Sequence, residues 1–421
     1  MKESEFNIKL RVDNEYIVYN ALTGALLRLQ EDESLLNRND VCEIDDLKTN
    51  GFIIEDNIDE FNMIQYQRQL CIWNKNEKMI RFSIALTMEC QAKCPYCFEK
   101  DALSSKRMTS EKADQVCAFL RDSLIRSKAK RLHITFYGGE PLLNTEAMLY
   151  IGKQMKAYCE KNDITFTTSM MTNGMLLDGD SAKAYASELN MVRSQITLDG
   201  TRDVHNRIKG MDCFDRVIKN IKDSSKSFKI YVRLNVSSDN ISDMDNLIGQ
   251  LGKYFVDEKN IKVYLARIRD DLRVKSATAN SLTVAEFNNY VMKIYENRSL
   301  TFLEGQAPPP VARTHCSFEG IYNFCIDPDG YLYKCEHDVG NSDYAVGDVC
   351  SGEYYNEREM RFYRNYDGKC ITTRCAYLPI CSGGCMMERN KDIVAKCTDT
   401  REAINNSIIH FYRERRKGKW R

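Results

Sequence analysis

The sequence has no excess of either charge, because 60 lysine and arginine residues balance 60 aspartate and glutamate residues. A chain without net charge has no long-range field that would draw it to nucleic acid or to an anionic membrane surface. It also has no run of about 18 apolar residues to span a bilayer, and no basic and apolar leader at its start. We therefore expect neither nucleic acid nor a membrane as a partner, and we expect a soluble, cytoplasmic protein.

Cysteine is the residue that the chain has in excess, with 17 residues in 421. A reducing cytosol gives little reason for disulfides, so metal ligation is the natural explanation. Nine cysteines lie between Cys316 and Cys397, and only three lie between residues 98 and 315, which predicts a metal-rich C-terminal module. We interpret five others as small buried apolar residues: Cys42, Cys71, Cys117, Cys159 and Cys213.

Short β-prone runs alternate with amphipathic helical patterns from about residue 80 to about residue 270, which predicts an α/β domain with about six parallel strands. A strand over 81–90 is followed by a helix that Thr109 or Ser110 caps. Ligands of parallel α/β sheets collect at the carboxyl ends of the strands, where four candidate motifs stand. Further strands are predicted at 132–137, 165–171, 192–198, 229–236 and 261–267.

Composition suggests boundaries on either side of this domain. A hairpin pattern at 16–29 belongs to a small N-terminal α+β unit, and the proline-rich stretch at 306–312 marks a spacer, because proline resists helices and central strands. The expected parts are the N-terminal unit (1–75), the α/β domain (80–305), a cysteine-rich domain (312–400), and a C-terminal helix with a basic tail (401–421).

Three cysteines within eight residues, Cys90, Cys94 and Cys97, follow the first predicted strand. Zinc usually takes four ligands, whereas three thiolates in one loop leave one coordination position vacant. A [4Fe–4S] cluster held by three thiolates keeps one iron open, which can chelate an amino acid through its amine and carboxylate. Buried cysteines packed in a core would explain neither the compact spacing nor the position at a strand end.

With an aromatic residue after it, this motif resembles the C-x3-C-x2-C signature of the radical S-adenosylmethionine (SAM) superfamily. The resemblance covers residues 80–270 and implies a partial (β/α)6 barrel that binds SAM. It continues in GGEP at 138–141, in TNG at 172–174 and in LDGTRDVHNRIKG at 198–210. In the last segment, Lys209 stands where the family commonly has an arginine for the SAM carboxylate, and Arg207 is the nearest arginine. We interpret His205 as a packed residue with no redox role.

The resemblance implies a role for each matching position. The backbone around Tyr96 reads the adenine, the glycines admit the SAM amine with Glu140 close by, and the TNG turn lies near the ribose. The implied SAM-binding residues are Tyr96, Phe98, Gly138, Gly139, Glu140, Pro141, Thr172, Asn173, Ser194, Arg207 and Lys209.

The C-terminal cysteines are similar in spacing to the SPASM extension of peptide-modifying radical SAM enzymes, which binds two auxiliary [4Fe–4S] clusters. A DPDG turn at 327–330 predicts a hairpin that brings Cys325 and Cys335 together. By resemblance, one cluster is held by Cys316, Cys325, Cys335 and Cys385, and the other by Cys370, Cys375, Cys381 and Cys397.

Two alternatives stay open for these cysteines. The spacing C-x4-C from Cys370 to Cys375 departs from the family's C-x2-C, so Cys350 is an alternative ligand of the second cluster. Eight cysteines could instead hold two zinc ions, the less favoured alternative, which would make the chain a zinc-stabilised binding module without enzymatic activity.

The resemblance implies reductive cleavage of SAM, hydrogen abstraction from a substrate carbon, and loss of a second electron to an auxiliary cluster. A flavodoxin or ferredoxin would supply the low-potential electron. A proton acceptor is also needed, and we nominate Glu336, which follows Cys335 directly, with His337 and Asp338 as neighbours able to substitute. A solvated loop carboxylate is the alternative interpretation of Glu336.

Substrate class also rests on resemblance. Residues 15–60 loosely resemble the leader-binding domain of peptide maturases. This resemblance favours a ribosomally made precursor peptide as the substrate and a thioether or carbon–carbon crosslink as the product. The alternative interpretation of these residues is an ordinary N-terminal extension. A close rival function is the oxidation of a sulfatase cysteine or serine to formylglycine. The basic tail at 411–421 is interpreted as a solvated chain end.

Overall fold

The structure, a computed structural model, describes residues 1–31, 33–37, 40–73, 78–268, 280–297, 311–312, 316–352, 368–385 and 397–416. The chain divides into unit 1 (1–76, 306–319 and 361–421) and unit 2 (77–305 and 320–360). The division does not follow the expected linear order, since the cysteine-rich region contributes to both units and the N-terminal residues group with the C-terminal ones. Of the predicted spacer and tail, residues 306–310 and 417–421 lie outside the described residues.

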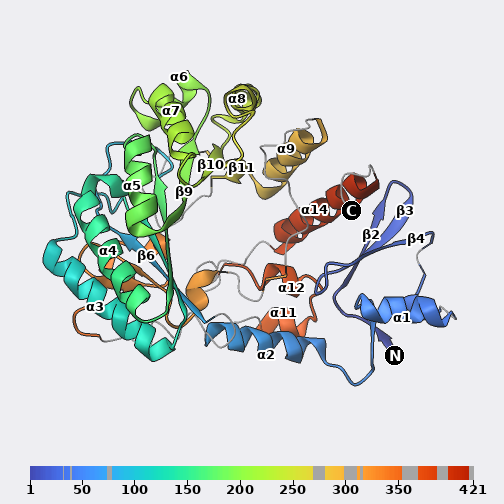
Figure 1. The fold of residues 1–421 in the computed structure, drawn as a ribbon. Helices are drawn as coiled ribbons and strands as arrows, with labels where there is room; N and C mark the ends of the chain where they lie inside the picture. The colour runs from blue at the N-terminus through green and yellow to red at the C-terminus, as the bar shows by residue number, and fades with distance from the viewer. Residues whose placement is uncertain are drawn as a thin grey trace. The chain divides into compact units, whose positions relative to one another are not determined.

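Six strands of unit 2 run parallel in chain order from β6 to β11 (Figure 1), which confirms the predicted parallel sheet. Side chains alternate between the two faces: on β7, Leu132 and Ile134 are fully buried, while His133 and Thr135 lie on the other face. The strands are β6 (Met79–Ala85), β7 (Arg131–Tyr137), β8 (Thr165–Thr172), β9 (Met191–Leu198), β10 (Lys229–Val236) and β11 (Ile261–Arg267).

Helices connect these strands, as the predicted βα alternation requires. The first helix begins after Thr109, whose side chain accepts a hydrogen bond from the backbone N–H of Lys112 and so caps it. Neighbouring helices α3, α4 and α5 pack in sequence (Figure 1). The helices are α3 (Ser110–Ser127), η2 (Pro141–Asn144), α4 (Thr145–Lys161), α5 (Gly179–Leu189), α6 (Arg202–Lys209), α7 (Phe214–Ser224), α8 (Ile241–Tyr254) and α9 (Val284–Asn297).

The C-terminal hairpin extends the same sheet at its β6 edge. Strand β12 pairs with β6 in parallel, which sets Cys325 opposite Ser83, and β12 pairs with β13 antiparallel. Asp327 closes the turn by accepting hydrogen bonds from the backbone N–H groups of Asp329 and Tyr331, so the predicted hairpin is confirmed. The elements are β12 (Phe324–Ile326), β13 (Tyr331–Tyr333), η4 (Glu336–Asp338), η5 (Ser342–Tyr344) and β14 (Gly347–Asp348).

Unit 1 contains a three-stranded antiparallel sheet, β2-β3-β4, and a two-stranded pair, β1-β5. The hairpin predicted at 16–29 is β3 with β4, whereas β2 was not predicted. The elements are β1 (Lys2–Glu3), β2 (Asn7–Val12), β3 (Glu15–Asn20), β4 (Leu26–Leu29), η1 (Leu35–Asn37), α1 (Val41–Thr49), β5 (Ile53–Ile54), α2 (Glu60–Ile72), η3 (Ser317–Glu319), α11 (Gly368–Thr372), α12 (Leu378–Cys381) and α14 (Cys397–Arg416).

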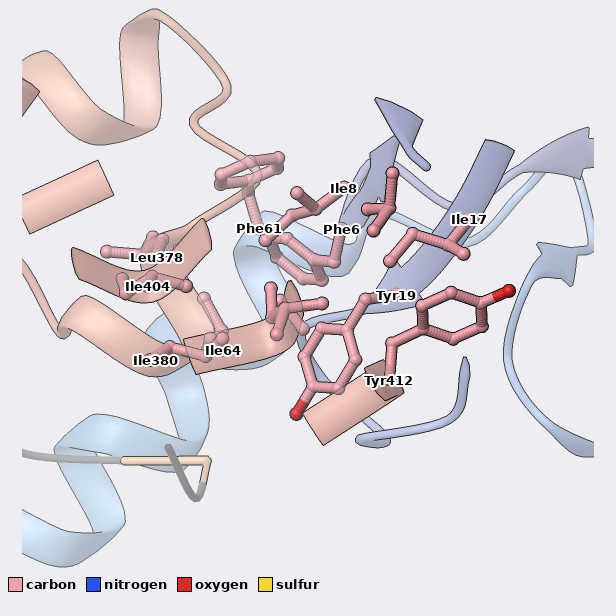
Figure 2. Close-up of a cluster of buried hydrophobic side chains, with 13 residues drawn as sticks. Phe6, Ile8, Ile17, Tyr19, Phe61, Ile64, Leu378, Ile380, Ile404 and Tyr412 are labelled. Carbon is pink, nitrogen blue, oxygen red and sulfur yellow. The ribbon is translucent and has the colours of Figure 1, made fainter. Parts of the chain in front are cut away.

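One apolar core joins the two ends of the chain within unit 1 (Figure 2). A buried ion pair adds to it: Arg68 of α2 lies 2.5 Å from the carboxylate of Glu319, and the side chains are 1% and 0% exposed. The N-terminal strands therefore depend on the last helix for their burial. The labelled core side chains are Phe6, Ile8, Ile17, Tyr19, Phe61, Ile64, Leu378, Ile380, Ile404 and Tyr412.

The five cysteines predicted as buried apolar residues divide into two groups. Cys117, Cys159 and Cys213 are buried, which confirms the prediction, and Cys71 is half-buried. Cys42 is exposed, so the prediction is wrong there, because this residue lies in the first turn of α1 on the side away from its buried residue Leu47.

Candidate active site

The three-cysteine loop leaves the carboxyl end of β6 and is fixed at several points. The backbone N–H of Lys93 donates to the carbonyl of Lys209 (2.9 Å), and that of Cys97 donates to the carbonyl of Cys94 (3.3 Å). Cys90, Cys94 and Cys97 are all half-buried. The predicted loop thus presents its thiols at the end of a strand of the parallel sheet.

The chemistry of these thiols fits a soft metal centre. Burial, with a smaller contribution from the neighbouring thiols, raises the pKa of Cys90 to about 11 and that of Cys97 to about 12. Ligand thiols must lose their protons, so a bound cation is what would stabilise three adjacent thiolates here. Sulfur ligands from a single loop, with no fourth protein ligand among them, suit an iron–sulfur cluster.

The two glycines of GGEP sit directly against the backbone that leads into this loop. Gly138 has φ +114°, and a Cβ atom on it would meet the carbonyl oxygen of Thr87 at 2.4 Å. A Cβ atom on Gly139 would meet the carbonyl oxygen of Glu89 at 2.4 Å. The glycines are therefore required for the packing of the turn against residues 87–89.

Glu140 joins the GGEP turn to the TNG turn. Its fully buried carboxylate accepts hydrogen bonds from the Thr172 hydroxyl (2.7 Å) and from the backbone N–H of Asn173 (2.9 Å). Burial raises the pKa of Glu140, although these hydrogen bonds act in the opposite direction. Pro141 follows as the first residue of η2 and is also buried. Two motifs at the ends of β7 and β8 are thereby held in one geometry.

A buried ion pair forms the third side of the site. The Lys209 ammonium lies 3.0 Å from the carboxylate of Asp199, whose other oxygen accepts from the Tyr96 hydroxyl (2.5 Å). Burial opposes both charges, but the pair prevails: Lys209 lowers the pKa of Asp199, and Asp199 raises the pKa of Lys209 well above its usual range. Lys209 also donates to the Tyr96 hydroxyl (3.3 Å).

The remaining residues of the LDG segment have structural positions. His205 is fully buried, and its Nδ1 accepts a hydrogen bond from the backbone N–H of Asp199 (3.2 Å). Burial lowers the pKa of His205 to about 4, so the ring is neutral near pH 7, as a packed residue would be. Arg207 is exposed. Ser194 shares the buried face of β9 with Ile196 and with Leu198 of the LDG motif, and its hydroxyl makes no hydrogen bond to a described residue.

The C-terminal hairpin brings a second polar group to the β6 side of the sheet. The Ser83 hydroxyl donates to the carboxylate of Glu336 (2.7 Å), and the His337 ring stacks on Phe98 with centroids 4.4 Å apart. Burial raises the pKa of Glu336, and burial with the charge of Glu336 raises that of Glu99 to about 8. Glu336 is therefore half-buried and hydrogen-bonded, contrary to its interpretation as a solvated loop carboxylate.

The predicted auxiliary cysteines are divided between the units. Cys325 and Cys335 belong to unit 2, whereas Cys316 and Cys385 belong to unit 1. Cys370, Cys375, Cys381 and Cys397 all belong to unit 1. The alternative ligand Cys350 belongs to unit 2, where its thiol contacts Lys112 and Gln115 of α3.

Three of the four cysteines predicted to hold the second auxiliary cluster, Cys370, Cys375 and Cys397, are connected by a backbone hydrogen bond and by a shared arginine. The backbone N–H of Cys375 donates to the carbonyl of Cys370 (2.9 Å). The Arg401 guanidinium lies 3.4 Å from the sulfur of Cys375, and both Cys375 and Cys397 raise the pKa of Arg401. Among the described residues, no group of three or more His, Cys, Asp or Glu side chains is arranged to hold a single metal ion.

Three residues of this region received no role from the sequence. Asp199 anchors both Tyr96 and Lys209, and its position within the LDG motif was the available signal in the sequence. Glu99 directly follows the motif aromatic, but nothing local indicates that it is 6% exposed. Tyr137, directly before Gly138, is 2% exposed, and only the pairing of β12 with β6 brings the hairpin cysteines near it.

Motifs from the ends of β6, β7, β8 and β9 meet at one edge of a parallel sheet, which defines an α/β enzyme with its site at the carboxyl ends of a partial barrel. Residues 84–251 match the Radical SAM superfamily. The chain therefore carries a radical SAM domain over these residues. In the described part of the chain, no helix has the length and apolarity needed to cross a membrane.

Relatives and solved structures extend the similarity beyond this domain. The chain is 23% identical to the cysteine-type anaerobic sulfatase-maturating enzyme of Clostridium perfringens, over 74% of this chain and 88% of that one. The structure of native anSMEcpe with bound AdoMet and Cp18Cys peptide is similar at a TM-score of 0.61 and 18% identity, covering 79% of this chain and 98% of the other. The structure of Streptococcus suis SuiB bound to precursor peptide SuiA is similar at a TM-score of 0.53 and 17% identity, covering 91% of this chain and 95% of the other.

Proposed function

We propose that this chain is a radical SAM maturase that installs a thioether or carbon–carbon crosslink in a ribosomally made precursor peptide. The observation that carries the proposal is the convergence, within unit 2, of the three-cysteine loop, the Glu140 network and the Asp199–Lys209 pair. Support for a peptide substrate comes from two similar structures, which hold the Cp18Cys peptide and the precursor peptide SuiA.

The residues at the strand ends have separate roles in this proposal. When bound, SAM and a [4Fe–4S] cluster supply a 5′-deoxyadenosyl radical that takes a hydrogen atom from a substrate carbon. Cys90, Cys94 and Cys97 hold the cluster. Glu140 fixes the turns that border the SAM site, and Lys209 is proposed over the exposed Arg207 as the cation near the SAM carboxylate. Ser194 stays a candidate for the SAM site, because its buried hydroxyl makes no hydrogen bond to a described residue.

Formation of the new bond removes a second hydrogen from the substrate as an electron and a proton. We assign the electron to auxiliary [4Fe–4S] clusters, one with Cys325 and Cys335 as ligands and one with the unit 1 set that includes Cys370. Three clusters in all imply about twelve irons per chain. Glu336 is the proposed proton acceptor, since it is anchored by Ser83 one residue after Cys335.

Replacement of Glu336 with Gln tests this step separately from SAM cleavage. The variant is expected to form 5′-deoxyadenosine at the rate of the native enzyme and to form no crosslinked product. Asp343→Asn, an exposed carboxylate of the following segment, is the control and should change neither rate. Normal product formation by the Glu336→Gln variant would remove Glu336 from the mechanism.

The N-terminal residues of unit 1 are proposed to bind the leader of the precursor, and a flavodoxin or ferredoxin of a reducing compartment such as the cytoplasm is proposed to deliver the electron. Truncating the enzyme is an unsuitable test, because residues of β2 and β3 share a core with α14. The substrate should be truncated instead: a precursor without its leader is expected to show a lower kcat/KM with the intact enzyme.

Oxidation of a sulfatase cysteine or serine to formylglycine is the second candidate, favoured by the similarity that spans 88% of the Clostridium perfringens enzyme. Mass spectrometry separates the two reactions on candidate peptides whose target residue is cysteine, because formylglycine formation from serine also removes only two hydrogens. A crosslink removes two hydrogens and retains every sulfur, whereas formylglycine formation from cysteine removes the sulfur.

Anaerobic reconstitution with iron and sulfide tests the shared chemistry. The protein should become brown and, with dithionite and SAM, should yield 5′-deoxyadenosine. Cys94→Ala is expected to abolish this yield and to lower the iron content by about four per chain. Cys117→Ala, a buried cysteine of α3, serves as the control with full iron content. A Cys94→Ala variant with unchanged iron and unchanged yield would refute the proposed site.

A further inference from the structure

Tyr137 is a buried polar residue without a partner among the described residues. It ends β7, directly before Gly138, and is 2% exposed, yet its hydroxyl makes no hydrogen bond there. A buried hydroxyl without a partner is costly, and nearly all such groups in folded proteins are hydrogen-bonded. The position therefore calls for an acceptor that becomes available when the enzyme is assembled with its bound groups.

Strand register sets the surroundings of Tyr137. Cys325 lies opposite Ser83 on β6, and Ser83 lies opposite Thr135 on β7. Residues opposite each other, and residues two apart on one strand, share a face of the sheet, so Tyr137 and Cys325 face the same side. The thiols of Cys325 and Cys335 lie close enough to raise the pKa of Tyr137, which burial already raises well above its usual range.

The carboxylates nearby do not serve as the partner. Glu336 accepts its hydrogen bond from Ser83. The Oε1 atom of Glu99 is itself buried without a hydrogen bond among the described residues. Both carboxylates lie near Tyr137, since both contribute to its pKa, but the hydroxyl bonds to neither. The thiols of the hairpin are the other described side chains that raise its pKa, and a cluster bound to them would bring further sulfur, which accepts hydrogen bonds.

We propose that the Tyr137 hydroxyl donates a hydrogen bond to a sulfur of the auxiliary cluster held by Cys325 and Cys335, and so raises the reduction potential of that cluster. The inference rests on the proposed function, which assigns a cluster to these cysteines. A reduced cluster carries one more negative charge, and a hydrogen-bond donor at its sulfur stabilises that charge. The cluster then accepts the second substrate electron more readily.

Tyr137→Phe tests the inference by removing the hydroxyl alone. In a background with Cys90, Cys94 and Cys97 replaced by alanine, redox titration followed by electron paramagnetic resonance reports the auxiliary clusters without the first one. At a fixed potential, the ratio of reduced to oxidised cluster is expected to fall about tenfold, which corresponds to about 59 mV for a one-electron couple. An exchangeable proton coupled to the cluster should also disappear from the double-resonance spectrum.

Tyr264→Phe is the matched control. Its hydroxyl donates a hydrogen bond to Gln195 (2.7 Å) on β9, and Tyr264 itself lies on β11, which five strands separate from β12 in the sheet. This variant should leave both readouts unchanged. An unchanged potential in Tyr137→Phe, with the cluster present, overturns the inference and leaves the proposed function standing. Iron content that is insensitive to Cys325→Ala would overturn the cluster assignment together with the inference.

Discussion

Replacing Lys209 with methionine removes an ammonium that lies 3.0 Å from the Asp199 carboxylate and keeps most of the apolar stem. The two charged groups are 5% and 0% exposed, so the remaining carboxylate is left buried without its counter-charge. Removal of one partner of a buried ion pair costs about 3–5 kcal/mol. Since the carbonyl of Lys209 accepts from the backbone N–H of Lys93, this loss should reach the cysteine loop.

Hydrogen exchange of the metal-free protein measures the effect locally. Because about 1.4 kcal/mol is a factor of ten, the Lys93 amide should exchange about a hundredfold to a few thousandfold faster in Lys209→Met. Lys219→Met is the control, since this lysine is 74% exposed and its pair with Asp223 lies at the surface. Its exchange pattern should match that of the native protein.

A double variant decides whether charge is the cause. Asp199→Asn combined with Lys209→Met leaves no uncompensated charge, so exchange of the Lys93 amide should be slower than in Lys209→Met alone. Native exchange rates in Lys209→Met would refute the buried-pair argument. A double variant that exchanges faster than Lys209→Met would assign the loss to packing instead of charge.

Three other predictions follow from other parts of the chain. Arg68→Met should lower the urea midpoint of unit 1 by an amount equivalent to about 3–5 kcal/mol, and adding Glu319→Leu should restore part of this loss. A double variant whose loss equals the sum of the two single losses would contradict the ion pair. Burial lowers the pKa of His133 to about 4, whereas a histidine of the unfolded chain has a pKa near 6.5. Between these two pKa values the unfolded chain binds more protons, so the stability of the folded protein falls as the pH falls from about 6.5 to about 4. His133→Gln should flatten this slope in urea titrations, and an unchanged slope would refute the assignment. Gly139→Ala should lower iron incorporation and SAM cleavage together, because its Cβ would meet the Glu89 carbonyl oxygen at 2.4 Å; normal values of both would show that the turn adapts.

The parallel strands were predictable because their signal is local. On β7 and β10, apolar residues alternate with polar ones over seven or eight positions, and each strand is followed by a turn of small residues. The hairpin of β12 and β13 was predictable for a similar reason, since Asp327 and Gly330 carry the turn. Such features depend on neighbours in sequence, which a single chain displays directly.

Other features were not predictable, because they depend on residues far apart in sequence. The pairing of β12 with β6 joins Cys325 to Ser83 across 242 positions of chain, and no periodic pattern announces it. The same holds for the ion pair of Arg68 with Glu319. Of the candidate site, the cysteine loop and the motif turns were predicted, whereas the burial of Glu99 and Tyr137 follows only from the assembled sheet.

The core that β2 and β3 share with α14 also sets an order of assembly during translation. Residue 20 leaves the ribosome long before Ile404 and Tyr412, which bury its neighbours. Even at about 20 residues per second, the delay is about 20 s. The six-stranded sheet is synthesised within that interval and the hairpin of β12 and β13 joins it next. Unit 1 closes last, and the proposed cluster ligands from 370 to 397 close with it, so this part of the chain would take up iron only after Ile404 and Tyr412 have been made.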